Sequence, residues 1–159
     1  MSVAFRRESD EEHLEPRFEL PIPPGRNLVT PRGRTLIERR VGELEAQLDA
    51  TAGDEARKPI ARDLRYWKTR RATALDTPAR DDGIVGFGTC VTFTLAGRDR
   101  TVTIVGDDEA DPNAGLLAHS APLARALMGA GAGELVAFNG REDAIEIVAV
   151  TVPVAATRD

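Results

Sequence analysis

Apolar residues recur at steps of three and four residues in the first half of the chain, which is the spacing of one face of a helix. Between positions 31 and 51 the repeating residues are Ile37, Val41, Leu44 and Leu48. Thr30 and Pro31 mark the start of the helix. Threonine caps the first turn of a helix, and proline is tolerated at the first helical position because an N–H there would have no partner within the helix. The pattern predicts a helix over 31–51, ended by Gly53.

A second stripe, formed by Ile60, Leu64, Trp67 and Leu75, predicts another helix. We expect it to begin at Lys58 with Pro59 as its first helical residue, because a proline in the second turn would kink an earlier start. The two helices would form an antiparallel hairpin, a short coiled coil. Its expected seam is Leu44, Leu48, Leu64 and Trp67, with Trp67 the largest buried side chain.

From Ile84 the period of the apolar residues changes to two, which is typical of strands. A turn at Gly97 and an Asn139–Gly140 step each predict a hairpin between strands. A short helix is expected over 122–128. The second half is therefore predicted to be an antiparallel sheet with one short helix packed on it, and the whole chain to be of the α+β class.

Four segments follow from this reading: a tail over 1–27, the helical hairpin over 28–80, the sheet domain over 81–153 and a second tail over 154–159. The first tail is acidic and rich in proline and has few apolar residues, so it is predicted to be flexible. The alternative is that it packs onto the domain through Phe18, Leu20 and Ile22.

The net charge of −5 is unevenly distributed. Residues 26–80 carry thirteen basic and eight acidic side chains, whereas residues 81–159 carry five basic and twelve acidic. The basic hairpin is therefore a candidate for contact with nucleic acid, and the acidic domain is not. One cysteine and two distant histidines do not suggest a metal site. No apolar run has the length of a membrane span, and the start lacks the pattern of a signal peptide, so we expect a cytoplasmic protein. We also expect it to be a monomer.

The most specific stretch is 104–129, where an acidic loop follows a strand and a Ser-Ala-Pro step opens a helix. Together with the flanking runs at 87–93 and 133–138, it resembles the C-terminal domain of the bacterial Gre family over about residues 82–152. Gre proteins are transcript-cleavage factors that enter the secondary channel of RNA polymerase. The resemblance implies an FKBP-like sheet and RNA polymerase as the partner.

The acidic loop allows three interpretations: a cation site, a solvated turn, or part of the surface that docks on the polymerase. The resemblance favours the third and implies that the docking residues are Asp107, Glu109, Asp111, Ser120, Ala121 and Pro122. Ala121 stands where the family usually has serine. This change removes a helix cap worth about 1 kcal/mol and one candidate hydrogen bond to the partner.

The tip of the hairpin decides whether cleavage is expected. Cleavage-active relatives carry two acids there that help to hold the polymerase's second magnesium ion. Here Asp54 and Glu55 are the candidate tip acids, but they are adjacent, no acid follows at the family spacing, and Arg57 and Lys58 lie beside them. The arm, about 30 Å long for 21 residues, is also shorter than in cleavage factors and similar to that of the Rnk type.

These features predict a regulator of transcription elongation that binds RNA polymerase at the secondary channel with weak or no stimulation of cleavage. We expect no catalytic residue and no cofactor of its own, magnesium entering only through the polymerase. A prolyl isomerase is a poor fit, because the sheet domain offers only Phe87, Phe93 and Phe138 as aromatic residues. The remaining alternative is a protein-interaction module of FKBP-like fold that does not bind polymerase.

Overall fold

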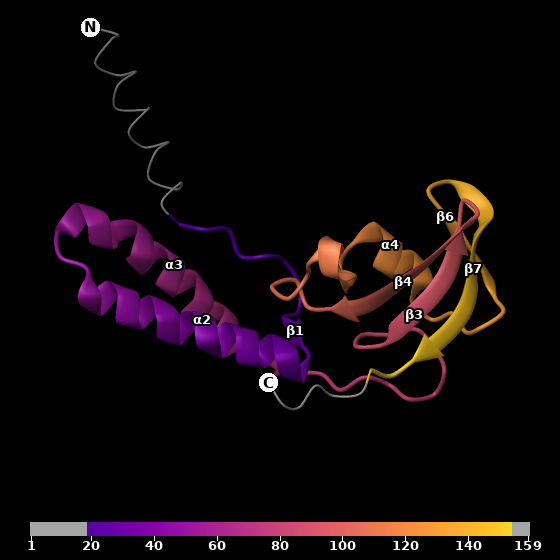
Figure 1. Ribbon diagram of the computed structural model, residues 1–159, viewed down its shortest axis with the longest axis horizontal. Helices are drawn as coiled ribbons and strands as arrows, with labels where there is room; N and C mark the ends of the chain where they lie inside the picture. Colours follow the sequence, from indigo (N-terminus) through magenta and orange to yellow (C-terminus); the bar gives the residue numbers. More distant parts are fainter. Residues whose placement is uncertain (1–18, 154–159) are drawn as a thin grey trace, which may run out of the picture. The chain divides into compact units, whose positions relative to one another are not determined.

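The computed structural model describes residues 19–153 and shows a helical hairpin and a five-stranded sheet (Figure 1). The fold is α+β, as predicted. In chain order the elements are β1 (Leu28–Val29), α2 (Pro31–Ala50), α3 (Asp54–Thr73), β2 (Leu75–Asp76), β3 (Cys90–Leu95), β4 (Arg98–Val105), the 3-10 helix η2 (Pro112–Ala114), β5 (Leu116–Ala118), α4 (Pro122–Leu127), β6 (Leu135–Phe138) and β7 (Arg141–Thr151). Among these residues, no helix combines the length and apolarity that crossing a membrane would need.

Helix α2 begins and ends close to the predicted bounds. The backbone N–H of Gly33 donates a 2.9 Å hydrogen bond to the Thr30 hydroxyl oxygen, so Thr30 is the N-cap that the sequence indicates. Pro31 occupies the first helical position. At the other end, Gly53 has a φ of +96°, a conformation that glycine adopts at little cost.

The predicted start of the second helix at Lys58 is wrong, because α3 begins at Asp54 and contains Pro59 in its second turn. Both Glu55, whose carbonyl loses its N–H partner, and Pro59 are exposed, so solvent can satisfy that carbonyl. The earlier start also places two carboxylates in the first turn, where they interact favourably with the helix dipole.

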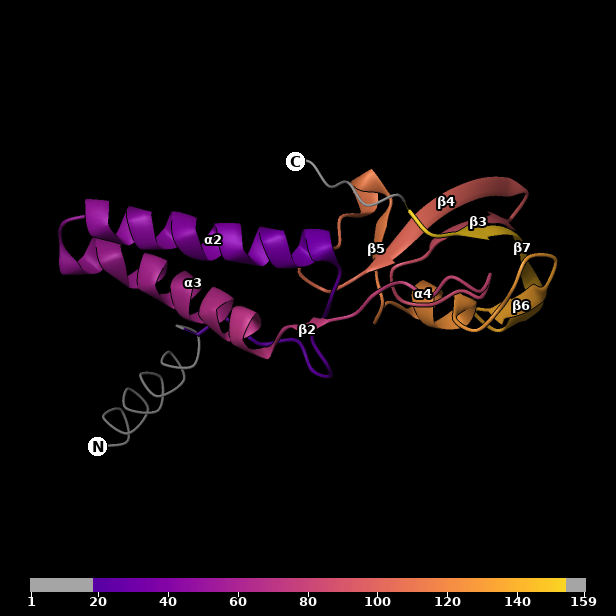
Figure 2. The same cartoon turned by 90° about the horizontal axis from the view of Figure 1, so that it is seen from below.

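The hairpin seam lies where the sequence places it, between the antiparallel helices of Figure 2. Its buried residues are Val41, Leu44, Ile60 and Leu64, with Leu48 and Trp67 packed against them. The expectation that Trp67 is the largest buried group is wrong. The indole is only partly buried, and the guanidinium carbon of Arg40 lies 5.7 Å from the centroid of its ring. The large side chain that is almost completely buried on α3 is that of Arg70, which is 2% exposed.

The residues directly before α2 and directly after α3 form a small parallel ladder that the sequence pattern did not predict, so Leu75 lies in β2 and not on the apolar stripe of the second helix. Leu28 pairs with Leu75 and Val29 with Asp76. The chain divides into two compact units: residues 19–25 and 37–73 form one, and residues 26–36 and 74–153 form the other. The ends of the segment assigned to the hairpin, 28–36 and 74–80, thus group with the sheet.

The five strands are ordered β5-β4-β3-β7-β6. Three of the four pairings are antiparallel, as predicted, but β5 runs parallel to β4, with Thr103 opposite Leu116 and Val105 opposite Ala118. The expectation of a wholly antiparallel sheet is therefore wrong at this edge. The acidic loop and η2 together give the chain enough length to return to the level of Thr103 before β5 begins, which a tight hairpin turn would not allow. The likeness to FKBP stays a prediction.

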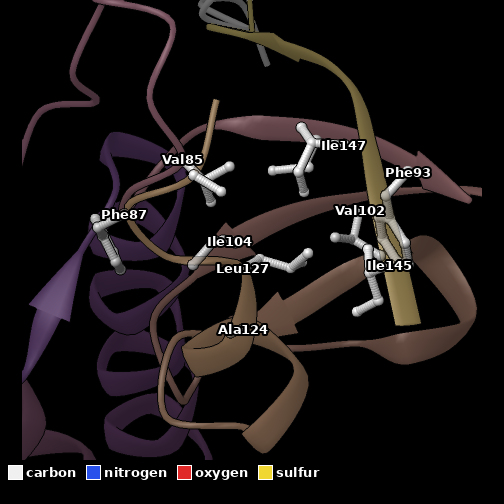
Figure 3. Close-up of a cluster of buried hydrophobic side chains, with 11 residues drawn as sticks. Val85, Phe87, Phe93, Val102, Ile104, Ala124, Leu127, Ile145 and Ile147 are labelled. Atoms are coloured by element: carbon white, nitrogen blue, oxygen red, sulfur yellow. The ribbon is translucent and has the colours of Figure 1, made fainter. Parts of the chain in front are cut away.

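The core of the sheet unit lies between its inner face and α4 (Figure 3). Alternate residues of β3, β4 and β7 point inward, and α4 contributes Ala124 and Leu127. The buried strand residues are Val91, Phe93, Val102, Ile104, Ile145 and Ile147. Both predicted turns are present: Ala96 and Gly97, and Asn139 and Gly140, have the paired positive φ angles that tight hairpins require.

Of the predicted tail 1–27, the structure describes residues 19–27, which contain no helix or strand. Within it, Ile22 is 45% exposed and Leu20 is partly buried. Residues 1–18 and the second predicted tail, 154–159, lie outside the described part.

Candidate functional site

The parallel pairing of β4 and β5 brings the acidic loop beside the start of α4. Because the carboxyl ends of parallel strands meet at one edge of a sheet, the residues that follow Val105 and Ala118 leave the sheet together. The backbone N–H of His119 donates to the carbonyl of Val105 at 2.9 Å and extends the ladder by one residue. Ser120 Oγ then donates a 2.6 Å hydrogen bond to Asp107 Oδ1.

His119 belongs to the same cluster and was not predicted from the sequence. Its Nε2 lies 4.0 Å from Asp107 Oδ2, and its ring packs edge-on against Phe87 with 5.6 Å between centroids. The buried Nε2 has no hydrogen-bond partner among the described residues. The only signal in the sequence was its position directly before Ser120.

Ala121 and Pro122 open α4 at this edge. Ala121 is the N-cap and makes no side-chain capping bond, but its carbonyl accepts a hydrogen bond from the N–H of Arg125 at 3.0 Å. Pro122 fixes the first helical position and is exposed. The structure therefore gathers Asp107, Ser120, Ala121 and Pro122 on one edge of the sheet unit; we call these four residues the loop–helix surface.

Glu109 is placed differently from the other predicted docking residues. It is only 6% exposed, and its Oε1 accepts a 2.5 Å hydrogen bond from the Thr30 hydroxyl. Its Oε2 lies 3.9 Å from Arg32 Nη1. Because Glu109 is turned toward the first turn of α2, we leave it out of the loop–helix surface.

Asp111 is exposed and precedes the 3-10 helix, but its side chain does not cap that helix. Its backbone instead pairs with Leu116 in both directions, at 2.9 and 3.0 Å, and so closes the acidic loop. The side chain remains available at the surface. Nothing in the arrangement brings its carboxylate together with those of Asp107 and Glu109.

The tip of the hairpin has two exposed acids in the first turn of α3. Glu55 pairs with Lys58 at 3.1 Å, with both side chains largely exposed. Arg57 lies under the turn, where its Nη1 donates to the carbonyls of Leu48 at 2.5 Å and Thr51 at 3.0 Å. Arg57 therefore closes the turn between the helices, a role that the sequence did not indicate.

The donor atoms do not form a metal site in the part of the chain that the structure covers. Across residues 19–153, no group of three or more histidine, cysteine or acidic side chains could hold a metal ion. At the tip, Asp54 and Glu55 are adjacent in sequence and Lys58 competes for Glu55. This pair of carboxylates is thus a poor match for shared coordination of one magnesium ion.

Comparison with known proteins places the chain in a family. Residues 80–152 match the family described as "Transcription elongation factor, GreA/GreB, C-term". The chain is 31% identical over 123 residues to transcription elongation factor GreA of Geobacillus kaustophilus, covering 74% of this chain and 78% of that protein. Transcription elongation factor GreA of Thermomicrobium roseum is 40% identical over 68 residues, which is 42% of this chain and 44% of the relative's length. The chain belongs to the GreA/GreB family of transcription elongation factors, as the resemblance predicted.

One solved structure with similarity to the chain is that of GreA factor homolog 1 (Gfh1) of Thermus thermophilus. It shares 13% sequence identity over 79% of this chain and 99% of that one, with a TM-score of 0.37.

Proposed function

We propose that the chain binds bacterial RNA polymerase at the entrance of its secondary channel and regulates transcription elongation there. Membership in the GreA/GreB family supports the partner. The loop–helix surface supports the place of contact, because Asp107, Ser120 and Pro122 lie together on one edge and two of them are held by a 2.6 Å hydrogen bond. Asp111 is a further exposed candidate beside them.

We further propose that the chain stimulates transcript cleavage weakly or not at all. The observation that carries this proposal is the hairpin tip, where the available acids are adjacent and Glu55 is paired with Lys58. Arg57, held against the turn carbonyls, keeps a second positive charge beside them. The positive charges of Lys58 and Arg57 would therefore repel a magnesium ion at this tip.

The test is a stalled elongation complex with end-labelled RNA, given this chain alone and then mixed with a cleavage-active GreA. We expect little shortening of the RNA with the chain alone and reduced cleavage by GreA in the mixture, because both would occupy one entrance. Robust cleavage that survives Asp54→Ala with Glu55→Ala would contradict the account of the tip. Absence of both binding and competition would contradict the proposed partner.

The loop–helix surface can be tested separately. Pro122→Arg should weaken polymerase binding, since it places a long charged side chain at the start of α4. Pro78→Arg is the matched control, because Pro78 is also exposed and precedes the sheet rather than α4. Equal loss of binding in both variants, with the fold intact by circular dichroism, would exclude a specific role for Pro122.

A further inference from the structure

Only the second part of β4 has a neighbouring strand on both sides. β5 pairs with Thr103, Ile104 and Val105, whereas β4 begins at Arg98. Among the described residues, no strand lies beside positions 98–102 on the side away from β3. Figure 2 shows β4 extending past β5 at the margin of the sheet. The sheet therefore has an open edge over residues 98–102, which we call the β4 edge.

Backbone hydrogen-bonding groups face the β4 edge. The N–H of Thr103 donates at 2.8 Å to the carbonyl of Gly115, directly before β5. Successive residues of a strand direct their backbone groups to opposite sides, so every second residue faces the same neighbour. Asp99 and Thr101 therefore direct their N–H groups to the side on which Thr103 meets Gly115. An added strand would find these groups in the spacing of a normal ladder.

The side chains along the β4 edge place two arginines on one face. Arg98 and Arg100 are two residues apart in a strand, so they project to the same side of the sheet. This is the core side, because the guanidinium carbon of Arg100 lies 5.8 Å from the centroid of the buried Phe93 ring. Asp99, between them, projects to the other side, where its Oδ1 accepts a 2.7 Å hydrogen bond from the Thr94 hydroxyl. The nearest acid in the sequence thus does not neutralise the arginines.

The charge of this arginine pair indicates the kind of partner. Both side chains are exposed, and neither forms an ion pair with another residue of the part that the structure describes. Arginine binds carboxylates through two parallel hydrogen bonds. Carboxylates on alternate residues of an extended segment recur at about 6.6 Å, the spacing of Arg98 and Arg100 themselves.

Two other occupants fit the β4 edge less well. A second copy of the chain, paired edge to edge, would bring four arginines together, and like charges on neighbouring strands are destabilising. A nucleic acid could meet the arginines through its phosphates, but it lacks the alternating N–H and carbonyl groups that an open strand edge pairs with.

We propose that the β4 edge binds an extended acidic segment of a partner protein, which adds to the sheet as a further strand beside residues 98–102. Main-chain hydrogen bonds supply the affinity, and Arg98 and Arg100 select carboxylates at alternate positions. The loop–helix surface follows the other end of β4, about 20 Å away at 3.3 Å per residue. Binding at the β4 edge therefore leaves that surface free and does not depend on polymerase binding.

Strand addition is tested on the full chain by NMR. The probe is a short synthetic peptide in which valine and glutamate alternate, and its control has lysine in place of glutamate. We expect the acidic peptide to shift the amide signals of residues 98–103 and to slow hydrogen exchange at Asp99 and Thr101, whose N–H groups gain acceptors. Equal responses to the two peptides, or shifts without slower exchange at these two amides, would overturn the proposal.

The role of the arginines is tested by titrating the acidic peptide into variants. Arg98→Gln with Arg100→Gln should weaken its binding about tenfold at low salt and less in concentrated salt, because two exposed charge pairs are lost. The matched control, Arg125→Gln with Arg141→Gln, removes two exposed arginines from α4 and β7 for the same change in net charge. Equal losses in the two double variants would reduce the effect to net charge and refute recognition by Arg98 and Arg100.

A backbone variant tests the edge itself. Thr101→Pro removes an N–H that faces the open side and leaves the ladder with β3 intact, so circular dichroism should be unchanged. Binding of the acidic peptide should be lost. Unchanged binding to the folded variant would show that the peptide does not pair with the β4 edge.

Discussion

The Thr30 hydroxyl joins the start of α2 to the acidic loop, because it accepts the N–H of Gly33 and donates to the carboxylate of Glu109. A helix cap is thus itself held by a residue from the loop after β4. A β-carbon at position 33 would come within 2.9 Å of Glu109 Oε1, so a larger residue than Gly33 would displace this carboxylate. The same loop approaches β1 so closely that Gly106 faces the Leu28 carbonyl with no room for a side chain.

Glu109→Ala should therefore destabilise the sheet unit although it lies in a loop. We expect a loss of about 1.5–3 kcal/mol in the free energy of unfolding, because a hydrogen bond to a charged group is removed from a buried site. Urea unfolding monitored by circular dichroism measures it. Asp111→Ala, in the same loop but exposed, is the control and should change stability by about 0.5 kcal/mol or less. Equal small effects of both would show that the capping interaction contributes little.

Arg57→Ala should loosen the hairpin tip. The guanidinium satisfies two carbonyls at the end of α2, and its positive charge is favourable at a helix carboxyl end. We expect a cost of about 1–2 kcal/mol in the unfolding free energy. Lys58→Ala, which removes only an exposed pair with Glu55, should cost about 0.5 kcal/mol. Amide hydrogen exchange of residues 48–53 should be faster in Arg57→Ala than in Lys58→Ala, which would show that the lost stability lies in the turn. Identical exchange in the two variants would contradict a role of Arg57 in closing the turn.

Trp67→Ala should cost less than the size of the side chain suggests. Because the indole is only partly buried, we expect a loss below about 3 kcal/mol, against about 2–5 kcal/mol for Leu44→Ala in the centre of the seam. The fluorescence maximum of this single tryptophan should lie between those of buried and fully hydrated indole. Emission at the wavelength of free tryptophan would place the ring outside the seam.

The carboxyl of Glu19 should titrate below the ordinary range of glutamate, because Arg65 donates two hydrogen bonds to its charged form. Since the pKa is lower in the folded state than in the unfolded one, the stabilisation is present above the unfolded pKa and is lost as pH falls through the folded value. NMR titration of the side-chain carboxyl measures this. Arg65→Gln should return the pKa toward its ordinary value, whereas Arg71→Gln, at an exposed position on the same helix, should not. An ordinary pKa in the unaltered chain would mean that the pair does not persist in solution.

Local sequence determined the features that depend on neighbours along the chain. Thr30 and Pro31 specify the start of α2, and the steps of three and four residues specify the seam, because a helix repeats every 3.6 residues. Ala96–Gly97 and Asn139–Gly140 specify two hairpins, because their positive φ angles suit few other residues. The predicted start of α3 was wrong because Pro59 leaves the Glu55 carbonyl without an N–H partner, and solvent can hydrogen-bond to this carbonyl instead. The pattern of residue types does not show that this position is exposed.

The tertiary structure decided everything that depends on pairing across long separations. The parallel register of β5 on β4 brings Ser120 to Asp107, thirteen residues away. A period of two is the same for parallel and antiparallel strands, so the sequence could not distinguish them. In the sequence, Glu109 and Asp111 are two acids of the same loop with nothing to distinguish them. In the structure, Glu109 is buried against Thr30 and Asp111 is exposed. The residue types and spacings thus determined which acids are present, and packing determined which of them face solvent.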